Sequence, residues 1–395
     1  MSAVPAMIGL GPDRPRLIAF YLPQFHPIPE NDEWWGAGFT EWSHVAQARP
    51  LFRGHHQPHL PGELGFYDLR LPETRAAQAE LARDHGISAF CYWHYWFAGR
   101  RILERPFDEV LRSGEPRFPF CLGWANQDWY GNPYRLLIEQ TYPGLQDHTA
   151  HFSTLLKAFS DDRYLTVDGK PLLYFYKPSL LPDSKRVTDH WRELAHRAGL
   201  RGLHLVGEAL PSWTPTDYGF DAVVTIALPR RLDDLAWQRP WRTLRSLHRR
   251  LRNRPTIYSY SKILRTLLAE SRSGALSYQC VIPNWDNTPR WGVDGMVLRD
   301  STPERFRSHV RQALERAVAA PPAARLVFIK SWNEWAEGNY LEPDREFGRA
   351  HLRVLAEELE RLWPAATVSR SEFGRNGAVN AAAPAHKAVE QRPWV

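Results

Sequence analysis

The feature that most constrains the fold is a regular alternation of short apolar runs with longer amphipathic stretches. The apolar runs are rich in β-branched and aromatic residues, which predicts strands that are buried on both faces. Eight such runs are present, at residues 16–23, 87–93, 118–124, 171–176, 203–208, 222–228, 278–283 and 325–331.

Helical patterns follow most of these strands. Pro72 opens one helix, and Gly86 suits its C-terminal end. A second spans 184–199, a third begins at Thr302–Pro303, and a fourth covers 347–363. Eight strand–helix units in about 350 residues predict an α/β protein of the (β/α)8 (TIM) barrel type. A doubly wound sheet is the alternative, but no Gly-rich phosphate-binding loop follows any strand.

The barrel is expected to cover residues 16–363 as one catalytic domain. Two stretches are interpreted as insertions in it, at about 27–71 and 229–275. Residues 1–15 form an N-terminal extension. Residues 364–395 turn to Ala, Pro, Ser and Gly, which is typical of a disordered tail.

Polar and aromatic side chains gather where the predicted strands end, which is the rim that carries the active site in such barrels. A barrel without a binding site would not need these side chains at its rim. Together they predict a sugar pocket. The chain also has 17 Trp, and indole rings can stack on the apolar face of a sugar, although large α/β proteins bury aromatic residues too. The predicted substrate-binding residues are Tyr21, Gln24, His26, Trp42, Trp93, His94, Tyr95, Trp124, Asn126, Tyr176, Glu208, Trp285, Asp286, Asn287, Asn333 and Trp335.

Two glutamates three residues apart, Glu334 and Glu337, follow the last predicted strand. Glycosidic bond cleavage needs one group that protonates the leaving oxygen and a second that assists near the anomeric carbon. An extended chain would separate the two carboxylates by about 10 Å, and any turn brings them closer. Flanking Trp332 and Trp335 can exclude water and raise the pKa of one carboxyl. Two glutamates on a loop can equally be ordinary solvated or ion-paired side chains.

Several ordered motifs accompany the glutamates. They are Phe-Tyr-Leu-Pro-Gln-Phe-His-Pro at 20–27, Gly-Phe-Thr-Glu-Trp at 38–42, Cys-Tyr-Trp-His-Tyr-Trp-Phe at 91–97, Gly-Trp-Ala-Asn at 123–126, Pro-Asn-Trp-Asp-Asn-Thr-Pro-Arg at 283–290, and Phe-Ile-Lys-Ser-Trp-Asn-Glu-Trp-Ala-Glu-Gly at 328–338 with Tyr-Leu-Glu-Pro-Asp at 340–344. With them the chain resembles the glycoside hydrolase family 99-like proteins from about Arg16 to Trp363. Within that group it is most similar to the bacterial WbsX glycosyltransferases, which are found with O-antigen and lipopolysaccharide genes.

The resemblance implies a barrel and retaining chemistry of the endo-α-mannosidase type on a surface polysaccharide. It implies that Glu334 is the base that engages the substrate's 2-hydroxyl, and that Glu337 is the general acid/base at the glycosidic oxygen. The substrate's own oxygen would then be the nucleophile, through an anhydro-sugar intermediate. One departure is Gln127, where this branch usually has an acidic residue, and it puts the identity of the sugar in doubt.

Three other functions remain open. A glycosyltransferase of polysaccharide biosynthesis is the first, although the Asp-x-Asp motif of many metal-dependent transferases is absent. A metal-dependent polysaccharide deacetylase using His55, His56 and His59 is the second, because that spacing could ligate zinc. The third is an inactive sugar-binding module, against which the presence of both glutamates argues. We expect no metal or other cofactor in the reaction.

Charge and cysteine usage suggest where the protein works. Three cysteines, Cys91, Cys121 and Cys280, lie in apolar runs, which favours buried thiols in a reducing compartment. The N-terminus is a poor signal peptide, so we expect a cytoplasmic protein. The segment from Arg230 to Arg254 contains nine arginines and only two aspartates. This segment is either a solvated insertion or a contact for a membrane surface or lipid-linked glycan, and we expect no nucleic acid partner.

Overall fold

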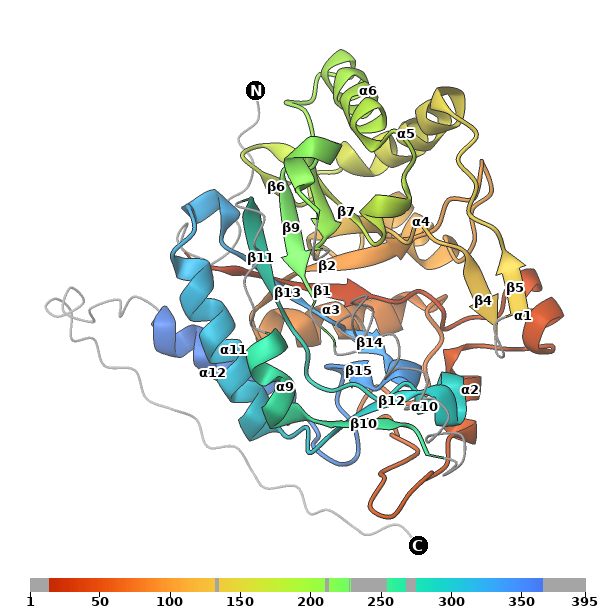
Figure 1. Ribbon diagram of the computed structural model, residues 1–395, viewed down its shortest axis with the longest axis vertical. Coiled ribbons are helices and arrows are strands. Elements are labelled where there is room, and N and C mark those ends of the chain that lie inside the picture. The colour runs from red at the N-terminus through yellow and green to blue at the C-terminus, as the bar shows by residue number, and fades with distance from the viewer. Residues whose placement is uncertain are drawn as a thin grey trace, which may run out of the picture.

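The computed structural model describes residues 14–131, 135–209, 213–226, 228, 254–267 and 275–364. Its centre is a closed barrel of parallel strands in the order β3-β2-β1-β13-β11-β9-β8-β7, and β3 also pairs with β7 (Figure 1). The barrel strands are β1 (Arg16–Tyr21), β2 (Ile87–His94), β3 (Phe120–Trp124), β7 (Lys170–Phe175), β8 (His204–Glu208), β9 (Ala222–Thr225), β11 (Leu276–Val281) and β13 (Leu326–Ile329). Each overlaps one of the eight predicted runs, so the (β/α)8 barrel is confirmed.

Helices form the outer layer. The longer ones are α3 (Pro72–Asp84), α4 (Arg105–Ser113), α5 (Leu145–Phe159), α6 (Ser184–Arg197), α9 (Tyr260–Leu267), α11 (Pro303–Val318) and α12 (Ala350–Leu362). The predicted helix ends are confirmed for α3 and α11. Helix α3 has proline in its first turn, and Gly86 follows the helix with φ +80°. The Thr302 side chain caps α11 by accepting a hydrogen bond from the amide of Arg305. Between β8 and β9 the described residues form only the short turn η2 (Pro215–Tyr218).

The two predicted insertions contain more structure than expected. Residues 27–71 include two short helices, α1 (Pro29–Trp35) and α2 (Glu41–Gln47). The second insertion contains β10 (Thr256–Ser259) and α9. Strand β10 pairs in parallel with β12 (Met296–Arg299), which follows the insertion, as does α10 (Thr288–Trp291). A further hairpin joins β4 (Trp129–Gly131) to β5 (Arg135–Ile138), and β6 (Thr166–Val167) pairs with β7. The arginine-rich segment 230–254 lies outside the described residues except for its last position.

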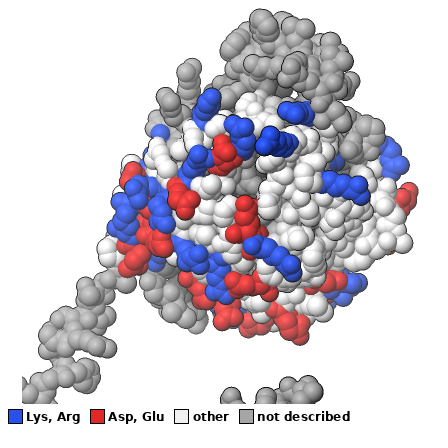
Figure 2. Space-filling view, turned by 90° about the horizontal axis from the view of Figure 1, so that it is seen from below, with Lys and Arg blue, Asp and Glu red and all other residues white. Residues whose placement is uncertain are grey.

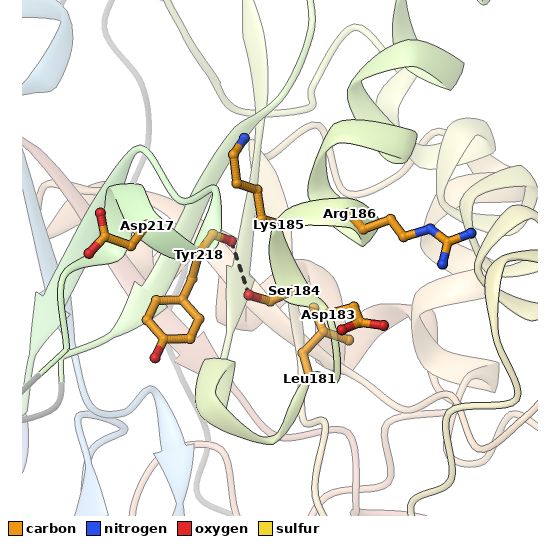
Figure 3. A pocket seen from close by; sticks show the side chains of 7 residues that line it. All are labelled: Leu181, Asp183, Ser184, Lys185, Arg186, Asp217 and Tyr218. Carbon is orange, nitrogen blue, oxygen red and sulfur yellow. Dashed lines mark hydrogen bonds between the residues drawn. The ribbon is translucent and has the colours of Figure 1, made fainter.

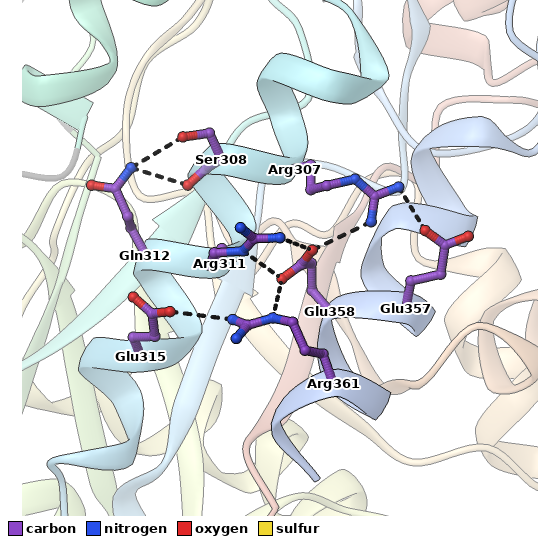
Figure 4. A network of polar contacts seen from close by, with 8 residues as sticks. All are labelled: Arg307, Ser308, Arg311, Gln312, Glu315, Glu357, Glu358 and Arg361. Atoms are coloured by element: carbon purple, nitrogen blue, oxygen red, sulfur yellow. Dashed lines mark hydrogen bonds and ion pairs between the residues drawn. The ribbon is translucent and has the colours of Figure 1, made fainter. Parts of the chain in front are cut away.

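Helices α11 and α12 pack side by side and are joined by charge pairs (Figure 4). Glu358 accepts hydrogen bonds from Arg307, Arg311 and Arg361, at 3.3, 2.9 and 2.9 Å. Hydrogen bonds from Arg311, despite burial, lower the pKa of Glu358 to about 2. These charge pairs fix α12 onto α11, the helix that precedes β13.

Three further features concern the cysteines, the helices and the surface. Cys91, Cys121 and Cys280 are buried and free, as predicted. None of the described helices combines the length and the apolar character needed to span a bilayer. Figure 2 shows a face on which basic and acidic side chains are interspersed.

Candidate active site

Residues 330–342 are named the catalytic loop for the role predicted for Glu334 and Glu337. The loop follows the last barrel strand and forms a tight hairpin. Its strands β14 (Asn333–Glu334) and β15 (Asn339–Tyr340) pair antiparallel around a 3-10 turn, η6 (Trp335–Glu337). The turn closes at Gly338, which has φ +63° and whose Cβ, if present, would lie 2.7 Å from the amide nitrogen of Asp286. The hairpin brings both glutamates to one amide, because Asn339 Nδ2 donates to Glu334 Oε2 at 3.3 Å and to Glu337 Oε2 at 3.4 Å.

Glu334 lies among groups that favour its charged form. Trp93 Nε1 donates to Glu334 Oε1 at 2.8 Å, and Lys330 Nζ is 3.7 Å from Oε2. Burial alone would raise the pKa of Glu334, but Lys330, Arg290 and the hydrogen bonds from Trp93 and Asn339 outweigh it and leave the pKa below its ordinary value. The Glu334 side chain is therefore a carboxylate, suited to accept a proton.

Glu337 lies in the opposite electrostatic setting. Arg290 donates to Glu337 Oε1 at 2.8 Å, and its other terminal nitrogen donates to Glu41 Oε1 at 2.7 Å. The same Glu41 oxygen accepts from the amide of Ala336 at 3.0 Å, which ties α2 to the catalytic loop. Burial raises the pKa of Glu337 in spite of Arg290, and the nearby charge of Glu334 adds to the rise. Glu337 is therefore the better proton donor of the pair.

A count of charges supports the same assignment. Three buried or half-buried carboxylates, Glu41, Glu334 and Glu337, meet two cations, Arg290 and Lys330. Three carboxylates around two cations disfavour ionisation of all three, so a proton on one of them is favoured. Burial raises the pKa of both Glu41 and Glu337, so the two carboxyls beside Arg290 are the ones whose surroundings favour the protonated form.

Aromatic rings wall the space beside Glu334. The Lys330 ammonium is buried and lies 5.5–5.8 Å from the centres of four rings, those of Phe20, Trp93, Tyr176 and Trp285. Tyr95 stacks on Trp129 with ring centres 5.3 Å apart. Burial raises the pKa of Tyr95, and Glu334 adds to it, so this hydroxyl stays protonated near the carboxylates. Four predicted residues thus lie close to Glu334 or to its neighbour Lys330, namely Trp93, Tyr95, Tyr176 and Trp285.

Asp286 supports the loop. Its carboxylate accepts from His55 and Gln57 at 2.7 Å each, and from the Thr288 hydroxyl at 2.6 Å. Its own amide donates to the backbone oxygen of Glu337 at 2.8 Å. Burial would raise the pKa of Asp286, but the hydrogen bonds from His55, Thr288 and Gln57 outweigh this effect and leave the pKa below its ordinary value. Asp286 therefore positions Glu337, and the His55 side chain is hydrogen-bonded to Asp286.

Other predicted residues are held by hydrogen bonds within the protein. The Asn333 amide bonds the backbone of Leu22 in both directions, at 2.7 and 3.0 Å, and Asn287 Oδ1 accepts from the amide of Met296. The indole nitrogen of Trp335 donates to Glu342 at 2.7 Å. The indole nitrogen of Trp42 donates to the backbone oxygen of Tyr67 at 2.8 Å. At the end of β8, Glu208 is buried and accepts from Tyr174 at 3.4 Å. The backbone oxygen of Gln24 accepts from the amide of Glu41 at 2.9 Å, and His26 contacts the Pro23 oxygen at 3.1 Å.

Four predicted pocket residues contact helices or neighbouring loops. Tyr21 donates to Gln78 of α3 at 2.7 Å, and His94 bonds His151 of α5 at 2.9 Å. Trp124 packs on Trp191 of α6 and on His151. Asn126 is fully buried and bonds the backbone of Lys177 in both directions. Their contact with a sugar stays a prediction, although alternation along a strand sends the side chains of Tyr21, His94 and Trp124 away from the barrel axis.

Four site residues escaped prediction: Glu41, Arg290, Lys330 and Asn339. The first three stand in the quoted motifs, and Asn339 lies between two of them, but nothing in the spacing shows that Glu41 and Arg290 meet across 249 positions. Lys330 carried a usable signal, since a lysine that directly follows a buried apolar strand must find partners at the rim.

A separate hollow of about 660 Å³ lies where the start of α6 meets η2 (Figure 3). Ser184 Oγ donates to the backbone oxygen of Tyr218 at 3.2 Å there, and the carboxylates of Asp183 and Asp217 point away from each other. It lacks the facing carboxylates found at the catalytic loop. Its lining is Leu181, Asp183, Ser184, Lys185, Arg186, Asp217 and Tyr218.

Comparison with known proteins identifies the family. The sequence profile described as Glycosyltransferase WbsX matches residues 17–355. The chain belongs to the WbsX glycosyltransferase family. This membership, which the motifs predicted, places it in a family of carbohydrate-active enzymes.

Two WxcX proteins of Xanthomonas campestris pv. campestris are similar to this WbsX family chain. The protein from strain B100 is 39% identical over 362 residues, and that from strain ATCC 33913 is 38% identical over 369. Each alignment covers 89% of this chain and 50% of the relative, so the chain spans about half the length of the curated relatives it matches.

Solved structures share the barrel. The GH99 endo-alpha-mannosidase from Bacteroides thetaiotaomicron superposes with a TM-score of 0.54 at 16% identity, covering 88% of this chain and 97% of that one. A glycoside hydrolase-like protein gives 0.55 at 16% identity, covering 91% and 97%. At such identities the likeness establishes the fold of this WbsX family member.

Proposed function

We propose that this chain cleaves or transfers a glycosidic bond in a bacterial surface polysaccharide of the O-antigen type, with retention of configuration. One observation carries the proposal: two carboxyl groups share the Asn339 amide, yet their surroundings move their pKa values in opposite directions. Pairs of this kind separate the base from the acid. The GH99 endo-alpha-mannosidase named above has the same barrel, and its name gives the kind of chemistry.

The proposed first step uses both groups at once. Glu334 takes the proton of the substrate's 2-hydroxyl, whose oxygen attacks the anomeric carbon, and Glu337 gives its proton to the departing glycosidic oxygen. One C–O bond forms and one breaks, which leaves a 1,2-anhydro sugar, a protonated Glu334 and an ionised Glu337.

The second step reverses these roles. Glu337 takes a proton from water or from an acceptor hydroxyl, which opens the anhydro ring at the anomeric carbon, and Glu334 returns its proton to the 2-oxygen. Two inversions at one carbon give net retention. Because the 2-oxygen must attack from the face opposite the leaving group, the proposal requires a 1,2-trans glycoside, as α-mannosides are.

The walls of the site fit a sugar ring. Trp93, Tyr176 and Trp285 provide apolar faces around Lys330. The Lys330 ammonium lies on the same side as Glu334, where a ring hydroxyl next to the 2-hydroxyl would reach it. A saccharide ring on aromatic walls with a few charged groups is the usual composition of such pockets.

Transfer to a sugar is the second candidate, and the family's description as glycosyltransferases favours it. Both outcomes share the first step and differ in the acceptor. Contact with a lipid-linked glycan or a membrane through residues 230–254, and a cytoplasmic location, stay predictions.

The test is product analysis by ¹H NMR. Purified protein is incubated with oligosaccharides from a bacterial O-antigen, with and without added acceptor sugar. The proposal predicts a first-formed product with the anomeric configuration of the substrate, and loss of the reaction in Glu334→Gln. An inverted product would overturn the mechanism.

A further inference from the structure

A second cluster of ligand-type side chains lies beside the catalytic loop. His56 and His59 come from the loop after α2, and Glu346 from the turn after β15. One donor atom from each lies within 4.8 Å of the others. His56 Nε2 is 3.5 Å from Glu346 Oε2, and the two imidazole rings are 5.0 Å apart.

The hydrogen bonds of His59 fix which ring nitrogen is free. Tyr340 donates its single hydroxyl proton to Asp344 Oδ2 at 2.9 Å. The contact of 2.9 Å between the Tyr340 oxygen and His59 Nδ1 must therefore use the proton of Nδ1. The His59 ring then keeps the lone pair of Nε2, and its plane is held by Tyr340 and Asp344. Metal-binding histidines are oriented in this way, by a hydrogen bond from the nitrogen that does not bind the ion.

We propose that His56, His59 and Glu346 bind a divalent transition-metal ion of the zinc type. Two imidazoles and a carboxylate are a common zinc ligand set, with water in the fourth position. Ligands on one zinc ion lie about 3.3 Å apart, and His56 and Glu346 are already close to that spacing. Their side chains are 54% and 38% exposed, so they can rotate toward the fixed His59.

The site joins two segments that support the catalytic glutamates. His59 contacts Tyr340 in β15, and the Tyr340 ring stacks on Trp335, centre to centre at 3.8 Å. Trp335 lies between Glu334 and Glu337 in the sequence. The backbone already links these segments, since Gly62 donates to the oxygen of Pro343 at 2.8 Å. The ion acts as a structural clasp of this contact, outside the reaction.

The structure separates this site from the zinc set considered in the sequence. His55 is hydrogen-bonded to Asp286 at 2.7 Å and is not part of the cluster of His56, His59 and Glu346. Glu346 takes the third position, from a segment 290 residues distant from His56. The proposal concerns binding and stability, so its outcome is independent of the proposed function.

Isothermal titration with ZnCl₂ tests the proposal on the full chain after removal of metal with EDTA. We expect one saturable site, at least about tenfold weaker in His56→Ala and in Glu346→Gln. At the same concentration, zinc should raise the melting temperature of the unchanged protein more than that of either variant. The control is His196→Ala, an exposed histidine on α6, which should bind zinc as the unchanged protein does.

Two results would overturn the proposal. One is the absence of a saturable zinc site in the unchanged protein. The other is equal zinc affinity in His56→Ala, Glu346→Gln and the control, which would place the bound ion elsewhere. Circular dichroism checks the fold of each variant, and both altered side chains are exposed.

Discussion

Replacing Lys330 by methionine removes the cation that holds Glu334 in its charged form. The Lys330 ammonium lies 3.7 Å from the Glu334 carboxylate, and both side chains are buried. At that distance and an effective dielectric constant of about 20, the attraction is about 4 kcal/mol. One pKa unit corresponds to about 1.4 kcal/mol, so the upper limit of the effect is about three pH units.

The sign follows from the role of Glu334 as a base. Loss of a cation favours the protonated carboxyl, so the acid limb of the profile of kcat/KM against pH should move upward. Arg290 and the hydrogen bond from Trp93 remain, and a single neighbouring charge typically moves a carboxyl by about one to three units. Activity should therefore fall at low pH and recover as pH rises.

The assay is kcat/KM measured against pH, which reports ionisations of the free enzyme. Lys330→Arg, which keeps the charge, should leave the acid limb near its original position. Lys177→Met is the matched control, because its ammonium lies over Tyr176 at 4.2 Å at the same rim. An acid limb that stays fixed while Lys330→Met loses activity equally at every pH would refute this reasoning.

Three further predictions concern the loop and the substrate. Gly338→Ala should lower both the melting temperature and kcat, because its Cβ would meet the Asp286 amide at 2.7 Å, whereas Gly348→Ala, with φ +53° and open space, should show backbone strain only. Burial raises the pKa of Glu342 to about 7, despite hydrogen bonds from Trp335 and its other partners. The folded protein therefore binds this proton more tightly than the unfolded chain does. The unfolding free energy measured by urea titration should thus lose roughly 3 kcal/mol between pH 4.5 and 7 relative to Glu342→Gln, and parallel curves for the two proteins would contradict this. A 2-deoxy substrate should react poorly with the intact enzyme, and normal cleavage would exclude participation by the 2-hydroxyl.

The barrel was predictable because parallel strands are buried on both faces and leave continuous apolar runs. Helix ends such as Pro72 and Thr302 carried local signals that do not depend on tertiary contacts. The short helices α1 and α2 lay in a region of Pro, Gly and Trp, where neighbouring segments rather than propensity stabilise them.

The site was predictable at the level of the rim and not of the individual contact. Tyr21 and Trp124 stand at strand ends like Trp93, but the sequence does not say which of two alternating positions faces the axis. The pairing of Glu41 with Arg290 joins the insertion after β1 to the segment after β11, and only the closed barrel brings these together.

The most direct test of the central claim compares Glu334→Gln and Glu337→Gln on aryl glycosides whose leaving groups differ in pKa. Glu337→Gln should lose about 10²–10⁴-fold on poor leaving groups and retain much of its activity on the most acidic phenols, since these depart without a proton. Glu334→Gln should be impaired on all of them, because the 2-hydroxyl must be activated whatever departs. Equal dependence of the two variants on leaving-group pKa would contradict the assignment of base to Glu334 and acid to Glu337.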